Sequence, residues 1–82
     1  MTMLAVFKSR SQTLDCISAL RAAGVHTQAV STPKDAGVGC GISVKFDEQF
    51  FPRVKAVLIK RPYSSFAGFM RAAGTAFVYV SG

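Results

Sequence analysis

Short β-forming stretches alternate with two amphipathic helical segments along this chain, and their order leaves few folds open to it. Residues 3–8, MLAVFK, are apolar on both faces, which is typical of a strand at the centre of a sheet. After a turn that offers Ser9 or Ser11 as a helix cap, apolar and small side chains recur at helical spacing. They are Thr13, Cys16, Ile17, Leu20 and Ala23, and Gly24 is a typical helix stop. We therefore predict a strand followed by a helix with one buried face.

The middle of the chain predicts two further strands joined by a loop. Residues 25–31, VHTQAVS, alternate in polarity, with Val25, Thr27 and Ala29 on one face and His26 on the other. Residues 32–41, TPKDAGVGCG, have the composition of a loop. Residues 42–46, ISVKF, alternate again, so that Ile42, Val44 and Phe46 would point inward and Ser43 and Lys45 outward.

A second helix is predicted from about residue 50 to Pro62. Asp47 and Glu48 suit the positive end of its dipole, and its core-facing side would carry Phe50, Val54, Val57 and Leu58. Pro52 fits only in the first turn. Residues 65–71 also have helical spacing, but a glycine in the middle of the segment and its place after a helix favour a strand. TAFVYV, residues 75–80, predicts the last strand.

This order, β-α-β-β-α-β, is typical of the α+β ferredoxin-like split βαβ sandwich, in which two helices cover one face of an antiparallel sheet. The final strand would be an addition at the C-terminus. With 82 residues, the length suits one domain, residues 1–82. In this topology the first and third strands are central, adjacent and antiparallel. The third strand would therefore start beside the end of the first strand and the first turn of the first helix.

Composition and charge narrow the classes of partner. Ten Lys and Arg against four Asp and Glu give a net charge of +6, which favours anionic partners. The basic residues are scattered and no nucleic-acid motif accompanies them, so we do not expect nucleic acid. No apolar run is long enough for a membrane span, and the first residues lack the basic leader of a signal peptide. We expect a cytoplasmic protein.

The two cysteines have different surroundings. Cys16 lies on the buried face of the predicted helix, where a cysteine behaves as a small inert hydrophobe. Cys40 lies between two glycines in GVGCGI, residues 37–42, which suits a thiol meant to be reached and equally a tight structural turn. Two cysteines in such a chain indicate reduced thiols rather than a structural bridge.

Topology would bring cationic groups and helix N–H groups toward Cys40. Residues 8–12, KSRSQ, face it with Lys8 and Arg10, and Lys34 comes from its own loop. Free N–H groups at a helix start favour a thiolate and can hold a small anion. The candidate site is therefore Cys40 as the reacting thiol, with binding residues Ser9, Arg10, Ser11, Lys34, Gly39 and Gly41.

Other chemistry is poorly supported. The glycines lead into a strand and no Lys-Ser pair follows them, unlike a phosphate-binding loop. Cys16, His26 and Cys40 lack the spacing of a zinc site, and a Cys–His dyad would arise only by chance proximity. We expect no metal, no cofactor and no independent catalytic turnover.

STPKDAGVGCGISVKFDEQFFPRVKAVL resembles the pattern of the Se/S carrier protein-like family of short bacterial proteins. The resemblance covers about residues 3–71, and Thr32-Pro33 and Cys40-Gly41 are its most specific matches; residues 72–82 lie beyond it. It implies that Cys40 is the carrier thiol, which at most relays persulfide or selenium between donor and acceptor proteins.

The residues leave two other functions open. One is a module that binds a ligand or a protein, with Cys40 structural. The other is RNA binding through the open sheet face, which needs exposed aromatic residues; alternation turns Phe7 and Phe46 inward instead. FVYV, residues 77–80, is an apolar strand that could pair with a second copy, so we also expect a homodimer.

Overall fold

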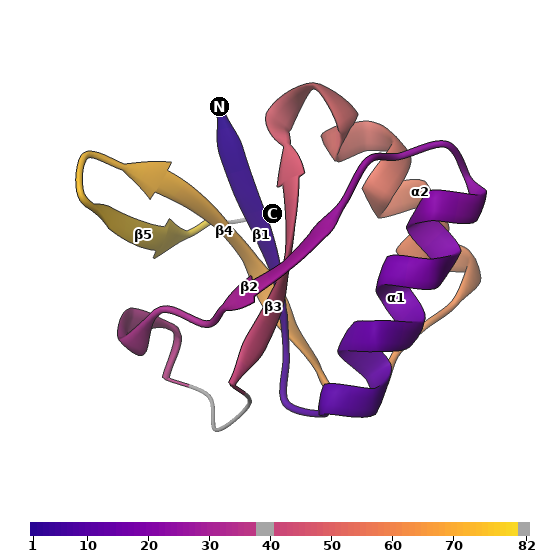
Figure 1. Cartoon of the computed structure of the whole chain (residues 1–82), viewed down its shortest axis with the longest axis horizontal. Coiled ribbons are helices and arrows are strands. Elements are labelled where there is room, and N and C mark those ends of the chain that lie inside the picture. The colour runs from indigo at the N-terminus through magenta and orange to yellow at the C-terminus, as the bar shows by residue number, and fades with distance from the viewer. Residues whose placement is uncertain (38–40, 81–82) are drawn as a thin grey trace.

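The computed structural model describes residues 1–37 and 41–80, which form one five-stranded antiparallel sheet and two α-helices (Figure 1). The elements follow in the order β1 (Thr2–Phe7), α1 (Arg10–Ala22), β2 (Gln28–Ser31), the 3-10 turn η1 (Lys34–Ala36), β3 (Ile42–Asp47), the 3-10 turn η2 (Glu48–Phe50), α2 (Phe51–Lys60), β4 (Phe66–Ala73) and β5 (Ala76–Tyr79). The strand order β2-β3-β1-β4-β5 is that of the predicted ferredoxin-like fold, extended by β5 at the β4 edge. The fold prediction is confirmed, and residues 66–73 are a strand rather than a helix.

Both helices cover the same face of the sheet (Figure 1). The side chains of β1 alternate between that face and the opposite one. Met3, Ala5 and Phe7 point into the helix-covered core, whereas Leu4 and Val6 point to the opposite face, which we call the second face. All five are buried because β1 is central, as its two-sided apolar pattern predicted.

The second face is also covered, by η1 and by the β4–β5 hairpin, which lie together on the left of Figure 1. Ala36 of η1 and Met70 of β4 are buried there with Leu4 and Val6. Ser43 was predicted to point outward; it does point away from the helices, but this cover leaves it fully buried.

The helices end where the sequence indicated. Ser9 caps α1, and its buried residues are Thr13, Cys16, Ile17 and Leu20. Ala23, predicted on the same face, is the exposed C-cap because the chain turns away there through Gly24 at φ +84°. Pro52 lies in the first turn of α2, where its missing N–H costs no helical hydrogen bond.

The second strand is shorter than predicted. It begins at Gln28 rather than at residue 25, because Val25 caps the turn after α1 through a hydrogen bond from its N–H to the carbonyl of Leu20 (2.9 Å). Val25 and Thr27 are buried as expected, but Ala29, predicted on the same face, is exposed on this edge strand.

Within the described ranges, neither helix is long and apolar enough to cross a membrane.

Candidate functional site

Cys40 and Gly39, the centre of the predicted site, lie outside the described residues, so the site is built from the segments that flank them. Before them, the loop leaves η1 through Gly37 at φ +69°, a left-handed conformation that favours glycine. After them, Gly41 is exposed and its carbonyl accepts a hydrogen bond from the N–H of Thr32 (3.1 Å). The hydroxyls of Thr32 and Ser43 lie 2.7 Å apart. Two hydrogen bonds therefore hold the two ends of the loop together.

The register of β1 and β3 agrees with the placement expected for the start of β3. The two strands are antiparallel, with Ala5 opposite Val44 and Met3 opposite Phe46. Moving two residues further along β1 and back along β3 brings Phe7 level with Ile42. The start of β3 thus lies beside the end of β1, only a few residues before α1 begins at Arg10.

The first turn of α1 brings three predicted binding residues together. Ser9 Oγ accepts a hydrogen bond from the N–H of Gln12 (3.3 Å) and lies 3.0 Å from Ser11 Oγ. Arg10 and Ser11 are exposed. This turn is therefore a capped helix start with hydroxyl groups and a guanidinium at the surface, a combination that attracts anionic groups.

A polar network that the sequence did not reveal joins this turn to the start of β4. Gln12 Oε1 accepts hydrogen bonds from Ser65 N (2.9 Å) and Ser65 Oγ (2.6 Å), and Gln12 Nε2 donates to Ser64 Oγ (3.0 Å). Ser9 N donates to Ser65 Oγ (3.2 Å). These contacts fix the start of α1 to the chain that enters β4. The only sequence signal was the Ser64-Ser65 pair before β4.

Lys34 lies elsewhere. It is exposed on η1, and Ala36 of this same turn packs against the second face, away from the helices. Tyr79 of β5 donates a hydrogen bond from its hydroxyl to the carbonyl of Ala36 (2.5 Å). β5 therefore holds η1 on the second face, so Lys34 lies on the opposite side of the sheet to Ser9 and Arg10.

Cys16 is fully buried in the helix-covered core. Burial raises the pKa of its thiol from 9.0 to about 12, and neighbouring Asp15 acts in the same direction while Arg61 opposes it. A thiol is nucleophilic only as the thiolate, so Cys16 is unreactive at neutral pH. The prediction that it is a core residue is confirmed.

Asp15 itself belongs to a surface cluster that joins α1 to the end of α2. Its Oδ2 accepts hydrogen bonds from Arg61 Nη1 (2.8 Å) and from the hydroxyl of Tyr63 (2.6 Å). Partial burial, followed by the hydrogen bond to Asp15, raises the pKa of Tyr63 and keeps it a donor. The ring of Tyr63 meets Phe7 edge to face at 5.4 Å. This cluster therefore links the two helices over the core.

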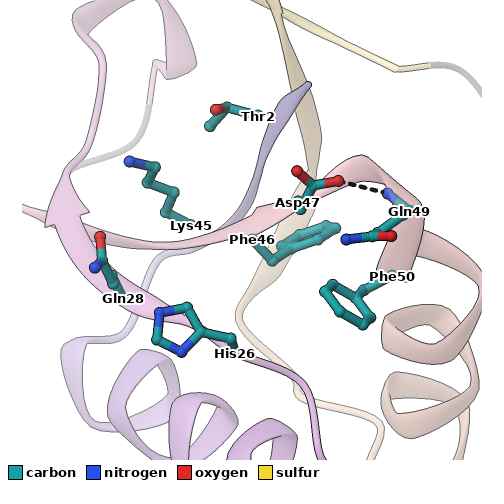
Figure 2. Close-up of a pocket in the computed structure, with 8 residues that line it drawn as sticks. All are labelled: Thr2, His26, Gln28, Lys45, Phe46, Asp47, Gln49 and Phe50. Atoms are coloured by element: carbon teal, nitrogen blue, oxygen red, sulfur yellow. Dashed lines mark hydrogen bonds between the residues drawn. The ribbon is translucent and has the colours of Figure 1, made fainter.

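His26 lies at the other end of the sheet, at the rim of a hollow of about 350 Å³ (Figure 2). Figure 2 shows it beside Gln28 and Lys45, with Asp47, Gln49 and Phe50 across the hollow. Asp47 is occupied by the N–H of Gln49 (3.0 Å) and by the terminal amine (3.8 Å). β3 spans the distance from this hollow to Gly41, so His26 is not placed to act on a thiol beside Gly41. It is exposed, as predicted, but precedes β2 rather than lying in it.

Two further classes of site find no support. Phe7 and Phe46 are buried, so they cannot stack on RNA bases. In the described part of the chain, no three His, Cys, Asp or Glu side chains gather as a metal site would require.

The comparison with known proteins gives one finding. The model of a family described as "Putative Se/S carrier protein-like" matches residues 2–64, or 63 of the 82 residues. The match includes both the Thr32-Pro33 and the Cys40-Gly41 pairs and ends before β4, so the β4–β5 hairpin lies beyond it. No curated protein and no solved structure matches the chain significantly.

Proposed function

The chain belongs to the Se/S carrier protein-like family, and from this premise we propose that it carries sulfur or selenium on the thiol of Cys40. The observation that supports Cys40 is the state of the other cysteine. Cys16 is fully buried and its pKa is raised to about 12, so it can neither meet a partner protein nor form a thiolate at neutral pH. A carrier that uses a cysteine of this chain must therefore use Cys40.

The surroundings of Gly41 favour a thiolate at the neighbouring position. The start of β3 lies beside the end of β1, and Lys8, Arg10 and the first turn of α1 follow directly. Positive charge and a helix N-terminus both stabilise a thiolate over a thiol. We propose that Ser9, Arg10, Ser11 and Lys34, with the glycines on either side of Cys40, form the surroundings in which the loaded sulfur is held.

Loading requires no oxidant. The Cys40 thiolate attacks the outer sulfur of a donor persulfide, a new S–S bond forms on Cys40, and the S–S bond of the donor breaks. The donor cysteine leaves as a thiolate, and the proton of the persulfide stays on the transferred sulfur. Delivery is the reverse step, in which an acceptor nucleophile attacks the outer sulfur and the Cys40 thiolate leaves. With selenium in place of the outer sulfur, the same steps apply.

This chemistry sets the partners and the compartment that we propose. A donor and an acceptor protein must each reach Cys40 in turn, and an acidic surface on either would be attracted by the net charge of +6. A thiol that cycles between free and loaded forms needs a reducing compartment, so we place the protein in the cytoplasm.

The experiment is persulfide transfer from a cysteine desulfurase supplied with L-cysteine, followed by mass spectrometry of the intact chain and of its peptides. We expect a gain of one sulfur atom on the peptide that contains Cys40. Cys16→Ala should load as well as the unaltered protein, and Cys40→Ser should not load at all. Equal loading of the Cys40→Ser protein would overturn the proposal.

Alkylation of the folded protein over a range of pH gives a second, partner-free test. Cys40 should react at neutral pH, whereas Cys16 should react only after unfolding. If Cys40 reacts no faster than free cysteine at every pH, then GVGCGI is a structural turn. The function would then lie in binding.

A further inference from the structure

An apolar groove runs along the outer side of α2 and the chain that leads into β4. One part of it, a hollow of about 340 Å³, is lined by Lys55, Leu58, Ile59, Pro62, Tyr63, Phe66 and Phe69. A second hollow continues it along α2 and shares Lys55 and Ile59. We call the two together the α2 groove. Six of its side chains are large and apolar or aromatic, and each of them is at least partly exposed: Phe51, Leu58, Ile59, Tyr63, Phe66 and Phe69.

Ile59 stands out in this groove. It is 77% exposed, more than any other large hydrophobic side chain in the described ranges. Leu58, Phe66 and Phe69 are half-buried, with their inner sides packed against the helix-covered core. A continuous apolar strip with one fully presented aliphatic side chain is typical of a protein–protein contact.

The charges beside the groove determine which kind of partner fits. Lys55, which lines both hollows, is exposed. The other exposed cations of α2, Arg53 and Lys60, lie on the side of this helix that faces α1. Asp15 accepts a hydrogen bond from Tyr63, which lines the groove, but its charge is paired with Arg61. Asp47 pairs with the terminal amine and Glu48 with Arg71. Lys55 Nζ lies over the ring of Phe51, 5.1 Å from its centroid. The groove is thus apolar with one lysine, Lys55, where its two hollows meet, and the net charge of +6 disfavours a second copy of this chain as its occupant.

One end of the groove, at Phe66, lies at the end of the sheet from which β3 starts, whereas its other end, at Phe51, lies close to where β3 ends. Phe66 pairs with Phe7 at the end of β1, and β3 begins on the other side of β1. Neighbouring strands are about 4.8 Å apart, so two strand spacings, roughly 10 Å, separate Phe66 from the start of β3. A protein seated in the groove would therefore extend to the Gly41 end of the loop without any movement of the sheet.

We propose that the α2 groove docks an amphipathic helix of an acidic partner protein. The apolar floor would take aliphatic side chains spaced i, i+3, i+4 and i+7, and Lys55 would pair with a carboxylate beside them. α2 has ten residues, or about 15 Å, which matches the length of such a contact. That the partner is a sulfur or selenium donor or acceptor rests on the proposed function, whereas the docking chemistry does not.

Two synthetic peptides test this. Both form an amphipathic helix with the same leucine face; one has glutamate on its polar face and the other has lysine. Backbone amide shifts of the ¹⁵N-labelled protein, followed during titration, report affinity and place. We expect the glutamate peptide to shift the amides of α2 and of residues 62–69, and the lysine peptide to bind at least tenfold more weakly.

Matched variants assign the contact to the groove. Ile59→Ala removes the presented side chain and should weaken the glutamate peptide about tenfold, whereas Leu14→Ala on α1, also exposed, should change nothing. Lys55→Glu should weaken it similarly, and Lys45→Glu on β3 should not. These residues are exposed, so the variants should fold, and their amide spectra verify it.

Several results would overturn the proposal. Equal binding of the two peptides would show that the groove does not select an acidic partner. Amide shifts centred on another surface would show that the peptide does not bind in the groove. Concentration-dependent shifts of α2 without peptide would assign the groove to a second copy. The Cys40→Ser protein separates the two proposals: if it binds the peptide but the unaltered chain never loads sulfur, the docking inference stands and the carrier function fails. Loading without peptide binding gives the opposite result.

Discussion

The two faces of the sheet are built differently, although the same strands supply both. Under the helices, aromatic rings pack against one another, with Phe66 and Phe69 at 5.0 Å and Phe51 and Phe69 at 4.9 Å between centroids. On the second face, a smaller cluster of Leu4, Val6, Ala36 and Met70 is covered, among the described residues, by η1 and the β4–β5 hairpin.

This difference divides stability from positioning. Two helices and a ring cluster bury the larger side chains, so the helix-covered face should supply most of the free energy of unfolding. The second face holds η1, and with it the chain that runs on to Cys40, through one buried alanine and the hydroxyl of Tyr79. We therefore expect changes on the second face to lower the free energy of unfolding less than changes on the helix-covered face.

The largest expected effect comes from Phe7→Ala on the helix-covered face. Phe7 is fully buried and contacts the rings of Tyr63 and Phe66 at 5.4 and 5.3 Å. Its loss should lower the free energy of unfolding by about 4 kcal/mol, measured by urea denaturation. Val6→Ala, one position earlier on the second face, is the control and should cost about 2 kcal/mol. Equal losses at both positions would contradict the division between the faces.

Gly68→Ala should lower the free energy of unfolding by about 2 kcal/mol, because the added methyl group would press on Tyr79 of β5. Gly68 has φ +142°, which other residues rarely adopt, and an added Cβ would lie 3.2 Å from two ring carbons of Tyr79. Gly74→Ala is the matched control: its φ is +63° but nothing lies within 4 Å of an added Cβ. Only Gly68→Ala should move the Tyr79 ring, seen as a change in its NMR shifts. If both variants leave those shifts unchanged, the position of the Tyr79 ring does not depend on the absence of a side chain at Gly68.

Alkaline pH should lower the free energy of unfolding through Cys16, which is buried under the helices. Burial raises the pKa of its thiol from 9.0 to about 12, so the folded state keeps a proton that the unfolded state loses. The contribution is fully present below pH 9 and is lost as pH rises toward 12. At pH 10 the deprotonation of Cys16 in the unfolded state should lower the free energy of unfolding by roughly 1 kcal/mol relative to neutral pH. Cys16→Ala should lack this part of the decline in urea denaturation at pH 7 and pH 10. Identical declines would show that Cys16 does not titrate as its burial predicts.

The smallest effect on stability should come from Tyr79→Phe on the second face. The change removes only the hydrogen bond to the Ala36 carbonyl, worth about 1 kcal/mol. Because that bond holds η1, we expect Tyr79→Phe to change the rate of Cys40 alkylation clearly, although its effect on the free energy of unfolding is small. Tyr63→Phe, which removes the hydrogen bond to Asp15 on the helix-covered side, is the control and should leave Cys40 alkylation unchanged. Equal Cys40 alkylation rates in the unaltered protein, Tyr79→Phe and Tyr63→Phe would show that the contact between β5 and η1 does not affect Cys40.

Much of the fold was legible in local patterns. The two-sided apolar run of β1 predicted a central strand, the helical spacing from Thr13 to Leu20 predicted the buried face of α1, and Ser9 and Gly24 predicted its ends. These patterns are reliable because each depends on neighbours within one or two turns of the chain. Where an interpretation was wrong, at Ala23 and Ala29, the position lay at the end or the edge of an element, where burial depends on what packs over it.

For the candidate site, the sequence alone determined the choice of residues: two cysteines, one on a helix stripe and one between glycines. Only the tertiary structure decided what surrounds them. The bond from Tyr79 to Ala36 joins residues 43 positions apart, and that from Ser65 to Gln12 joins residues 53 apart. No local pattern encodes such pairs, because their geometry follows from how the strands order in the sheet. Composition supplied the apolar residues of α2 and Lys55, but their gathering with Phe66 and Phe69 into one groove required β4 to fold back beside the helix.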